Sequence, residues 1–311
     1  MIQISELRKN FNGNRALDAF SLEVAEGELF GLVGPNGAGK TTLIKTLATL
    51  IKPSSGSVRI AGMDVQENRD AVKQITGYLP DQPGVYQDMR LREFLQFFAD
   101  AFHVDRERQS PVIESALRRA GLADRSDAFV EELSFGLKQR LVLAKTLLHN
   151  PKVLLLDEPA TGLDPIARLD LRRELQQLNA EGVTILISSH ILSDLEDICT
   201  RVALISNGKN AADADGNQII QLRRAAAPTQ IYEVEVLGSI ENALQATTSV
   251  FTATVLKAEN SRLLVQLAGS KAEAAALLQS LIAAGVQVAS FAPRSTTLEE
   301  RYQKAFGGTK P

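Results

Sequence analysis

The sequence predicts an α/β fold with a mixed sheet core, an inserted helical subdomain and a small α+β domain that follows. First, a glycine-rich loop separates an apolar run at 29–33 from residues with helical spacing at 43–51. Second, the runs at 153–156 and 183–187 are apolar throughout, as in parallel strands buried on both faces. Third, apolar residues between 91 and 151 recur at helical spacing, without strand-like alternation.

Composition and charge exclude several classes of protein. The 311 residues are 44% hydrophobic and carry a net charge of -3, which lacks the basic balance of a general nucleic-acid binder, so no nucleic-acid partner is expected. The single cysteine excludes an internal disulfide and fits a reducing compartment. No apolar stretch reaches the roughly 18 residues that span a membrane, and the start of the chain lacks a signal-peptide core. We therefore expect a cytoplasmic protein.

Residues 2–24 alternate between apolar and polar types in two segments that Asn12-Gly13-Asn14 joins. This pattern predicts two half-exposed strands and a tight turn. Phe11 lies just before the turn. It is either a core or turn aromatic or a face on which an adenine base stacks, and its spacing leaves both interpretations open.

The glycine-rich loop is the motif around which the other elements are arranged. It matches the pattern G-x-x-x-x-G-K-[ST] and stands between a strand and a helix, the context that this pattern requires. Glycines let backbone N–H groups surround a phosphate, and the helix start adds N–H groups and a positive dipole end. Lys40 supplies charge for the β- and γ-phosphates, and the Thr41 hydroxyl supplies a Mg²⁺ ligand. The candidate phosphate-binding residues are Gly34, Pro35, Asn36, Gly37, Ala38, Gly39, Lys40, Thr41 and Thr42.

Two strands and a helical region come next along the chain. A turn is expected at 53–56, and strands are expected at 57–61 and 75–79. From Leu91 the apolar residues mark one face of a helix. Ser110 and Pro111 are interpreted as the N-cap and first-turn residue of a second helix, which ends near Gly121.

Ser134 is predicted to cap a further helix, whose apolar stripe includes Leu137 and Leu141. A small residue and a glycine at a helix start can bind an anion through backbone N–H groups, so Ser134 and Gly136 form a second candidate phosphate site. A plain capped helix is the alternative, and the segment by itself favours that alternative.

Asp157 and Glu158 follow directly after the apolar run at 153–156. Carboxylates at the carboxyl end of a buried parallel strand lie in the crevice where α/β folds bind ligands. Asp157 is placed to reach Mg²⁺, through water, and Glu158 to polarise an attacking water as a general base. Solvated acids at a strand end are the alternative interpretation.

His190 has a similar position after the run at 183–187, on the same sheet edge as Asp157, where it can reach a γ-phosphate. Between these strands, Asp164 and Pro165 are expected to cap a helix. A further strand is expected at 201–206, followed by a turn at Asn207-Gly208.

Beyond Gly216 the sequence lacks these motifs. A short helix is expected around 219–222. The order βαββαβ is then expected, which suggests a ferredoxin-like unit. Its elements are placed at 231–237, 240–246, 252–256, 262–267, 272–284 and 286–291, and a last helix at 298–306. The expected domains are 1–215, with the helical subdomain at about 85–150, and 216–311.

Together, these motifs resemble the nucleotide-binding subunit of an ABC transporter over roughly residues 1–210, and the phrase TGLDP is most similar to the ABC-2 exporter branch. The resemblance implies a P-loop NTPase fold that binds ATP and Mg²⁺. It assigns the phosphate loop to 34–42, the family signature to 133–140, the acidic motif to 154–158, the inter-subunit loop to 162–164, the switch histidine to His190 and the adenine-stacking aromatic to Phe11.

The sequence departs from the family pattern at two places. Asp81 stands where many members carry a glutamine that senses metal, and Gln82 follows it; either residue is a candidate, and Asp81 can also bind Mg²⁺ or water. In the signature, Phe135 and Leu137 replace the common glycine and glutamine, whereas Ser134 and Gly136 remain.

The resemblance also implies a mechanism and two partners. Two copies meet head to tail, with each ATP between Lys40 of one copy and Ser134 of the other. Gly136 is expected to touch phosphate together with Ser134, and Asp164 belongs to the expected inter-subunit loop. A separate membrane-spanning subunit receives the motion on the inner face of the cell membrane, and the branch suggests export. A soluble ABC ATPase acting on ribosomes or DNA is one alternative. A regulatory nucleotide-binding module without hydrolysis is another, and Glu158 and His190 count against it.

Overall fold

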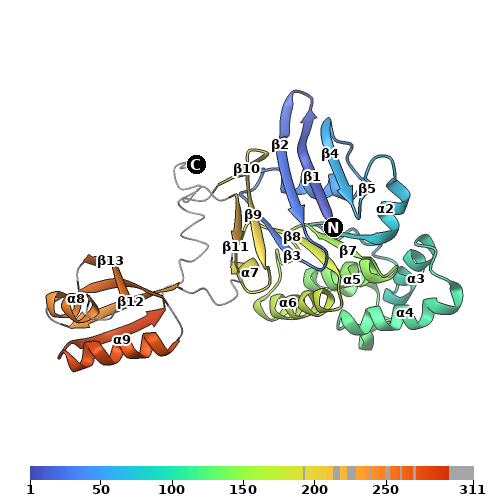
Figure 1. The fold of residues 1–311 in the computed structure, drawn as a ribbon. Helices are drawn as coiled ribbons and strands as arrows, with labels where there is room; N and C mark the ends of the chain where they lie inside the picture. Colours follow the sequence, from blue (N-terminus) through green and yellow to red (C-terminus); the bar gives the residue numbers. More distant parts are fainter. Residues whose placement is uncertain are drawn as a thin grey trace. The chain divides into compact units, whose positions relative to one another are not determined.

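The computed structural model describes residues 1–191, 193–212, 218–222, 229–237, 240–248, 253–259, 261–268 and 271–293. The chain divides into two compact units, Met1–Arg223 and Arg224–Glu300 (Figure 1). The expected boundary between 215 and 216 and the expected helix at 298–306 lie outside the described residues.

An antiparallel sheet of four strands forms one layer of the first unit, in the order β2-β1-β4-β5 (Figure 1). Its strands are β1 (Ile2–Phe11), β2 (Asn14–Val24), β4 (Ser55–Ile60) and β5 (Met63–Asp64). The alternation in residues 2–24 predicts the first pair correctly. Ile2 and Ile4 of β1 pair with Val24 and Leu22 of β2, and all four side chains are buried.

A second sheet of seven strands carries the parallel core, in the order β10-β9-β3-β8-β7-β6, with β11 also paired to β9. Its strands are β3 (Leu29–Val33), β6 (Thr76–Leu79), β7 (Val153–Leu156), β8 (Thr184–Ser189), β9 (Arg201–Ser206), β10 (Lys209–Ala211) and β11 (Ile219–Gln221). Every residue of β3, β7 and β8 is buried, as continuous apolar runs predict.

The expected short helix around 219–222 is wrong, because β11 is a strand. Ile219 pairs antiparallel with Ala203 and Gln221 with Arg201. β10 occupies only the end of β9 beyond Ala203, so the remaining backbone groups on that edge are free to pair with β11.

The hydrophobic core of this unit lies between the two sheets. α1 (Lys40–Leu47) supplies Leu43, Ile44 and Leu47 to it, together with buried residues from both sheets. The other helices beside the sheets are α2 (Arg69–Ile75), α6 (Pro165–Ala180) and α7 (Ser193–Glu196). α2 lies in a polar stretch with Val72 as its buried residue, so apolar periodicity did not predict it.

The helical subdomain contains three helices and two 3₁₀ turns around its own core. These are α3 (Leu91–Ala101), α4 (Arg106–Arg119) and α5 (Phe135–Leu147), with turns at Ala123–Arg125 and Val130–Glu132. The expected N-cap at Ser110 is wrong, because α4 begins at Arg106, after Asp105, and contains Pro111. The Gln109 side chain donates to Asp100 Oδ1 at 2.8 Å and to the Val104 carbonyl at 2.9 Å. These bonds join the first turn of α4, before Pro111, to the end of α3 and to the connection between the two helices.

The second unit has the predicted ferredoxin-like order. Its antiparallel sheet runs β13-β14-β12-β15, and the helices connect β12 to β13 and β14 to β15. The elements are β12 (Thr229–Leu237), α8 (Ile240–Thr248), β13 (Ala253–Glu259), β14 (Arg262–Ala268), α9 (Lys271–Ala283) and β15 (Gln287–Pro293). Tyr232, Val234, Leu277 and Leu281 lie in its core.

Candidate functional site

The glycine-rich loop joins β3 to α1 with its backbone pressed against neighbouring strands. A Cβ atom on Gly34 would lie 2.3 Å from the Ile205 carbonyl oxygen, and one on Gly39 would lie 2.7 Å from the Ala16 carbonyl oxygen. Gly37 and Gly39 also have φ values of 79° and 108°, which side-chain-bearing residues rarely adopt. The loop therefore needs glycine at these positions, and it leads its N–H groups into the start of α1.

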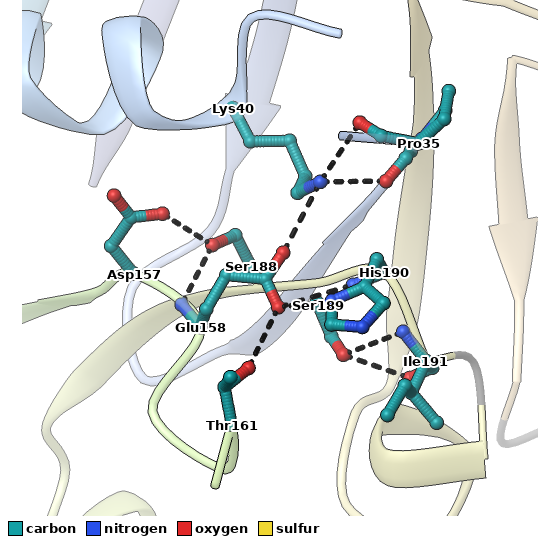
Figure 2. Close-up of polar contacts among 10 residues, drawn as sticks. Pro35, Lys40, Asp157, Glu158, Thr161, Ser188, Ser189, His190 and Ile191 are labelled. Atoms are coloured by element: carbon teal, nitrogen blue, oxygen red, sulfur yellow. Dashed lines mark hydrogen bonds and ion pairs between the residues drawn. The ribbon is translucent and has the colours of Figure 1, made fainter. Parts of the chain in front are cut away.

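Lys40, the first residue of α1, folds back across this loop. Its ammonium lies 2.6 Å from the Gly34 carbonyl oxygen and 3.1 Å from that of Pro35 (Figure 2). It also forms an ion pair of 3.2 Å with Glu158 Oε1, and the residue is only 5% exposed. The loop thus holds a buried cation at the N-terminus of α1, where a bound phosphate would contact both the ammonium and the helix N–H groups.

Asp157 and Glu158 follow β7, and Ser188 of the adjacent parallel strand β8 lies between them. The Ser188 hydroxyl donates to Asp157 Oδ1 at 2.8 Å and accepts from the Glu158 N–H at 3.0 Å (Figure 2). This one hydroxyl joins the Asp157 carboxylate to the Glu158 backbone. The sequence analysis did not identify this role of Ser188. Its position could have indicated it, because Leu156 pairs with Ile187 and the residues that follow, Asp157 and Ser188, therefore face each other across the two strands.

Asp157 is fully buried, and burial raises the pKa of its carboxyl group. The hydroxyls of Thr41 and Ser188 lower this pKa, whereas the charges of Asp81 and Glu158 raise it further. Its Oδ2 atom is buried without a hydrogen-bond partner in the described part of the chain. A buried carboxylate with a spare oxygen is costly unless a cation or donor faces it, so Asp157 fits a metal-linked role.

Glu158 is held by contacts on both of its oxygens. Oε2 lies 2.6 Å from His190 Nδ1 and 3.3 Å from the Thr161 hydroxyl, while Oε1 faces Lys40 (Figure 2). Burial alone would raise the pKa of this carboxyl, but the His190 hydrogen bond and the Lys40 charge outweigh it, so the pKa lies below its usual range. Glu158 also adopts a φ of 50°, an unusual conformation that aims its side chain at this cluster.

The donor set fits Mg²⁺ bound together with phosphates. Among the residues that the structure describes, no cluster of three or more His, Cys, Asp or Glu side chains could hold an ion alone. Mg²⁺ usually takes only one or two protein ligands and completes its shell with water and substrate phosphates. Thr41, at the start of α1, and Asp157 offer that set, while the exposed Asp81 and Gln82 follow β6 on the same sheet edge.

Phe11 ends β1, and its ring is 43% exposed, with the Lys9 ammonium 4.7 Å from its centroid. The following strand, β2, contacts the glycine-rich loop through Ala16, so the hairpin and the loop are neighbours. A ring here remains available to stack on a flat ligand, although among the described residues no hydrogen bond, ion pair or ring contact joins it to Lys40.

Ser134, Gly136 and Asp164 form a second cluster at the starts of α5 and α6. The Ser134 hydroxyl accepts from the Leu137 N–H at 3.4 Å, and Asp164 Oδ1 accepts from the Ile166 and Ala167 N–H groups at 3.0 and 2.9 Å. Both residues therefore cap helices, as their sequence contexts predict. Among the described residues, no hydrogen bond or ion pair links this cluster to Lys40 or Glu158.

Known sequences resemble this chain over most of its length. A family model described as ABC transporter matches residues 17–161. The ABC transporter ATP-binding protein YhcH of Bacillus subtilis (strain 168) is 33% identical over 100% of this chain and 97% of that protein. The Nod factor export ATP-binding protein I of Burkholderia pseudomallei (strain 1710b) is 36% identical over 74% of this chain and 76% of its own length.

Solved structures agree with this similarity. An ATP-binding subunit of an ABC transporter is 29% identical and covers 67% of this chain and 87% of its own, with a TM-score of 0.62. A dimeric ATP-binding cassette with ADP and Pi, in a post-hydrolysis state, covers 72% of this chain and 100% of its own with a TM-score of 0.64. Its identity is 22%, so this second likeness supports the fold alone.

Proposed function

This chain belongs to the ABC transporter ATP-binding proteins, and from that premise we propose that it hydrolyses ATP to power export through a separate membrane-spanning subunit. The observation that carries the proposal is the Glu158 carboxylate, which contacts both Lys40 of the phosphate loop and His190 after β8. Similarity to a protein named for Nod factor export supports the direction.

In this proposal, Lys40 and the backbone N–H groups of the loop bind the ATP phosphates, and Phe11 stacks on the adenine. Thr41 and Asp157 hold Mg²⁺, with Asp81 nearby, and the ion neutralises phosphate charge. The spare Asp157 Oδ2 supports this assignment.

Glu158 accepts a proton from the attacking water, and its lowered pKa keeps it ionised at neutral pH. His190 holds the carboxylate in position through Nδ1 and is placed to contact the γ-phosphate with the rest of its ring. A positioned base of this kind contributes typically about 10²–10⁴-fold to the rate.

The site is completed by a second copy of the chain. Ser134, Gly136 and Asp164 lie at helix starts that make no polar contact with Lys40 or Glu158 among the described residues, although such starts attract anions. Head-to-tail pairing brings them to the ATP of the partner copy. Each bond to a charged phosphate is worth about 1.5–3 kcal/mol, so loss of the γ-phosphate opens the pair.

The membrane subunit docks in a groove of about 870 Å³ beside α2, α3 and α5, lined by Leu50, Phe98 and Phe102 among others. We define this as the α3–α5 groove. No helix among the described residues is long and apolar enough to span a membrane, so the proposal places the spans in the partner. The protein then works at the inner face of the cell membrane.

The second unit is proposed to be an accessory domain that supports dimer formation. Removing it by ending the chain after Leu222 and measuring ATP-dependent dimerisation by sizing tests this role. A truncated chain that dimerises as tightly as the full chain would contradict it.

The main test is isolation of the full chain with its partners, followed by ATPase measurements on wild type and Glu158→Gln. We expect a membrane-spanning subunit to co-purify, and a loss of about 10²–10⁴-fold in turnover for the variant. Recovery of ribosomes or DNA instead would favour a soluble ABC ATPase. A purified complex without wild-type turnover would favour a regulatory nucleotide-binding module.

A further inference from the structure

Lys145 of α5 is a partly buried cation that faces the α3–α5 groove. Its ammonium lies 4.8 Å from the centroid of the Phe98 ring, and in the described part of the chain no carboxylate pairs with it. Burial lowers the pKa of this ammonium, and nothing described offsets that effect. A cation–π contact recovers only part of the cost of burying a charge, so Lys145 lacks an ion-pair partner among the described residues.

The second lysine of the groove, Lys73, has the ion-pair partner that Lys145 lacks among the described residues. Lys73 forms an ion pair of 3.9 Å with Asp70, and its side chain is 52% exposed. Water and a neighbouring acid therefore satisfy Lys73, whereas Lys145 has an aromatic face in place of an acid. The two side chains form a matched pair for experiment.

Three residues that line the groove also carry buried polar atoms without a hydrogen-bond partner among the described residues. Thr76 Oγ1, Tyr78 Oη and His149 Nδ1 are buried and lack hydrogen-bond partners in the described ranges, and all three residues line the groove. These atoms have no exposed surface, so they add polarity to the groove without offering a contact, and Lys145 is the group that an incoming side chain would meet.

We propose that the α3–α5 groove recognises a carboxylate on the docking segment of the membrane subunit, and that Lys145 is its ion-pair partner. This inference rests on the proposed function, which supplies the membrane subunit. An acidic side chain satisfies this single cation, while apolar neighbours on the same segment cover Phe98 and Phe102. We commit to a carboxylate of the membrane subunit rather than a lipid phosphate because the proposed function brings that subunit to this groove; Asp70, which lines the groove, disfavours both anions.

A zero-length carbodiimide crosslink tests this pairing directly, since it joins an amine only to a carboxylate in contact with it. The full chain in complex with its membrane subunit is treated with carbodiimide, digested and mapped by mass spectrometry. We expect an amide between Lys145 and an Asp or Glu in a cytoplasmic segment of the subunit. Absence of that linkage in an intact complex overturns the inference.

Substitutions give the second arm of the test. Lys145→Gln is expected to weaken association with the membrane subunit about 10- to 100-fold, the loss of one charge-assisted bond, while Lys145→Arg retains most of it. Lys73→Gln is the control and should stay within about twofold, as for a surface pair. Circular dichroism and ATP binding of the isolated chain should match wild type, because Lys145 touches no residue of the nucleotide site.

The outcomes separate this inference from the proposed function. If wild type captures no membrane subunit, both are overturned. If Lys145→Gln captures the subunit as tightly as wild type, the inference alone is overturned. Binding of wild type to phosphatidylglycerol vesicles that Lys145→Gln abolishes would also overturn it, in favour of a lipid phosphate.

Discussion

Lys40 and Glu158 form an ion pair of 3.2 Å that joins the phosphate loop to the end of β7. Both side chains are largely buried, so each neutralises the other in the absence of a ligand. A phosphate that approaches Lys40 would compete with Glu158 Oε1 for the ammonium, whereas Oε2 already contacts His190. In the proposed function, this pair would couple nucleotide binding to the release of Oε1 of the proposed base.

This competition predicts that Glu158→Gln binds ATP more tightly while losing turnover. Without the carboxylate, the Lys40 charge is fully available to phosphate, so we expect the Kd for ATP to fall several-fold, within the roughly tenfold that 1.4 kcal/mol represents. Fluorescence titration with a nucleotide analogue measures the Kd. Glu181→Gln is the control, because Glu181 pairs with Arg119 and touches none of the site. Unchanged or weaker ATP binding by the Glu158 variant would contradict the competition.

Ser188 is expected to matter as much as a direct ligand, because its hydroxyl joins Asp157 to the Glu158 backbone. Ser188→Ala should lower the apparent Mg²⁺ affinity in ATPase assays by about 10–100-fold, as loss of an outer-shell partner does. It should also reduce the free energy of unfolding by about 1–3 kcal/mol, since it leaves buried groups unpaired.

Ser189→Ala is the matched control for that change. The Ser189 hydroxyl contacts only the backbone of Ile191, and it makes no described contact with either carboxylate. A Mg²⁺ dependence that shifts equally in both variants would show that Ser188 has no special role.

The sequence predicted the strands and helices around the site because their signals are local. Gly34 to Lys40, Asp157 and His190 all stand at element ends that continuous apolar runs define, and the structure places Lys40, Glu158 and His190 in contact. The phosphate loop and the Ser134 site were also predicted to lie at the starts of two different helices. Which residues actually bind the nucleotide stays a prediction.

The features that the sequence did not predict have two kinds of cause. Ser188 acts through the β7–β8 register, β11 is a strand because β9 has a free edge, and α4 begins early because Gln109 bonds to Asp100. α2 buries little apolar surface, so it has no periodic signal. The Ser188 and β11 cases are settled by pairing between strands distant in the chain, which local pattern does not encode, whereas the α2 and α4 cases involve short-range features.

Asp157 is expected to lower the stability of the fold at neutral pH. Its folded-state pKa is raised, so its ionisation destabilises the protein progressively as the pH rises above its unfolded value of about 4. Asp157→Asn should therefore raise the unfolding midpoint at pH 7, with a difference from wild type that disappears near pH 4. Mg²⁺ affinity should fall by more than the about 10–100-fold typical of outer-shell partners.

Thermal unfolding followed across this pH range checks the sign. Glu158→Gln is the natural comparison, because the lowered pKa of Glu158 contributes stability that is present above its unfolded value and is lost as the pH falls. The two variants should thus differ from wild type in opposite directions at pH 7. An Asp157→Asn protein less stable than wild type at pH 7 would refute the argument.

Gly162 of the predicted inter-subunit loop lies against Phe135 of the predicted signature. Gly162 has a φ of 75°, and a Cβ on it would lie 3.0 Å from Phe135 Cε1. Gly162→Ala should reduce the free energy of unfolding by about 1–2 kcal/mol from the left-handed backbone alone. It should also weaken ATP-dependent dimerisation, because the displaced ring borders Ser134.

The double variant Gly162→Ala with Phe135→Ala separates the two causes. Removing the ring relieves the collision but leaves the backbone strain, so we expect dimerisation to recover while the loss of stability remains. Sedimentation velocity with ATP measures the first quantity, and chemical denaturation the second. Recovery of stability together with dimerisation would mean that the ring contact dominates; recovery of neither would mean that Phe135 does not transmit the change in the loop to the signature helix.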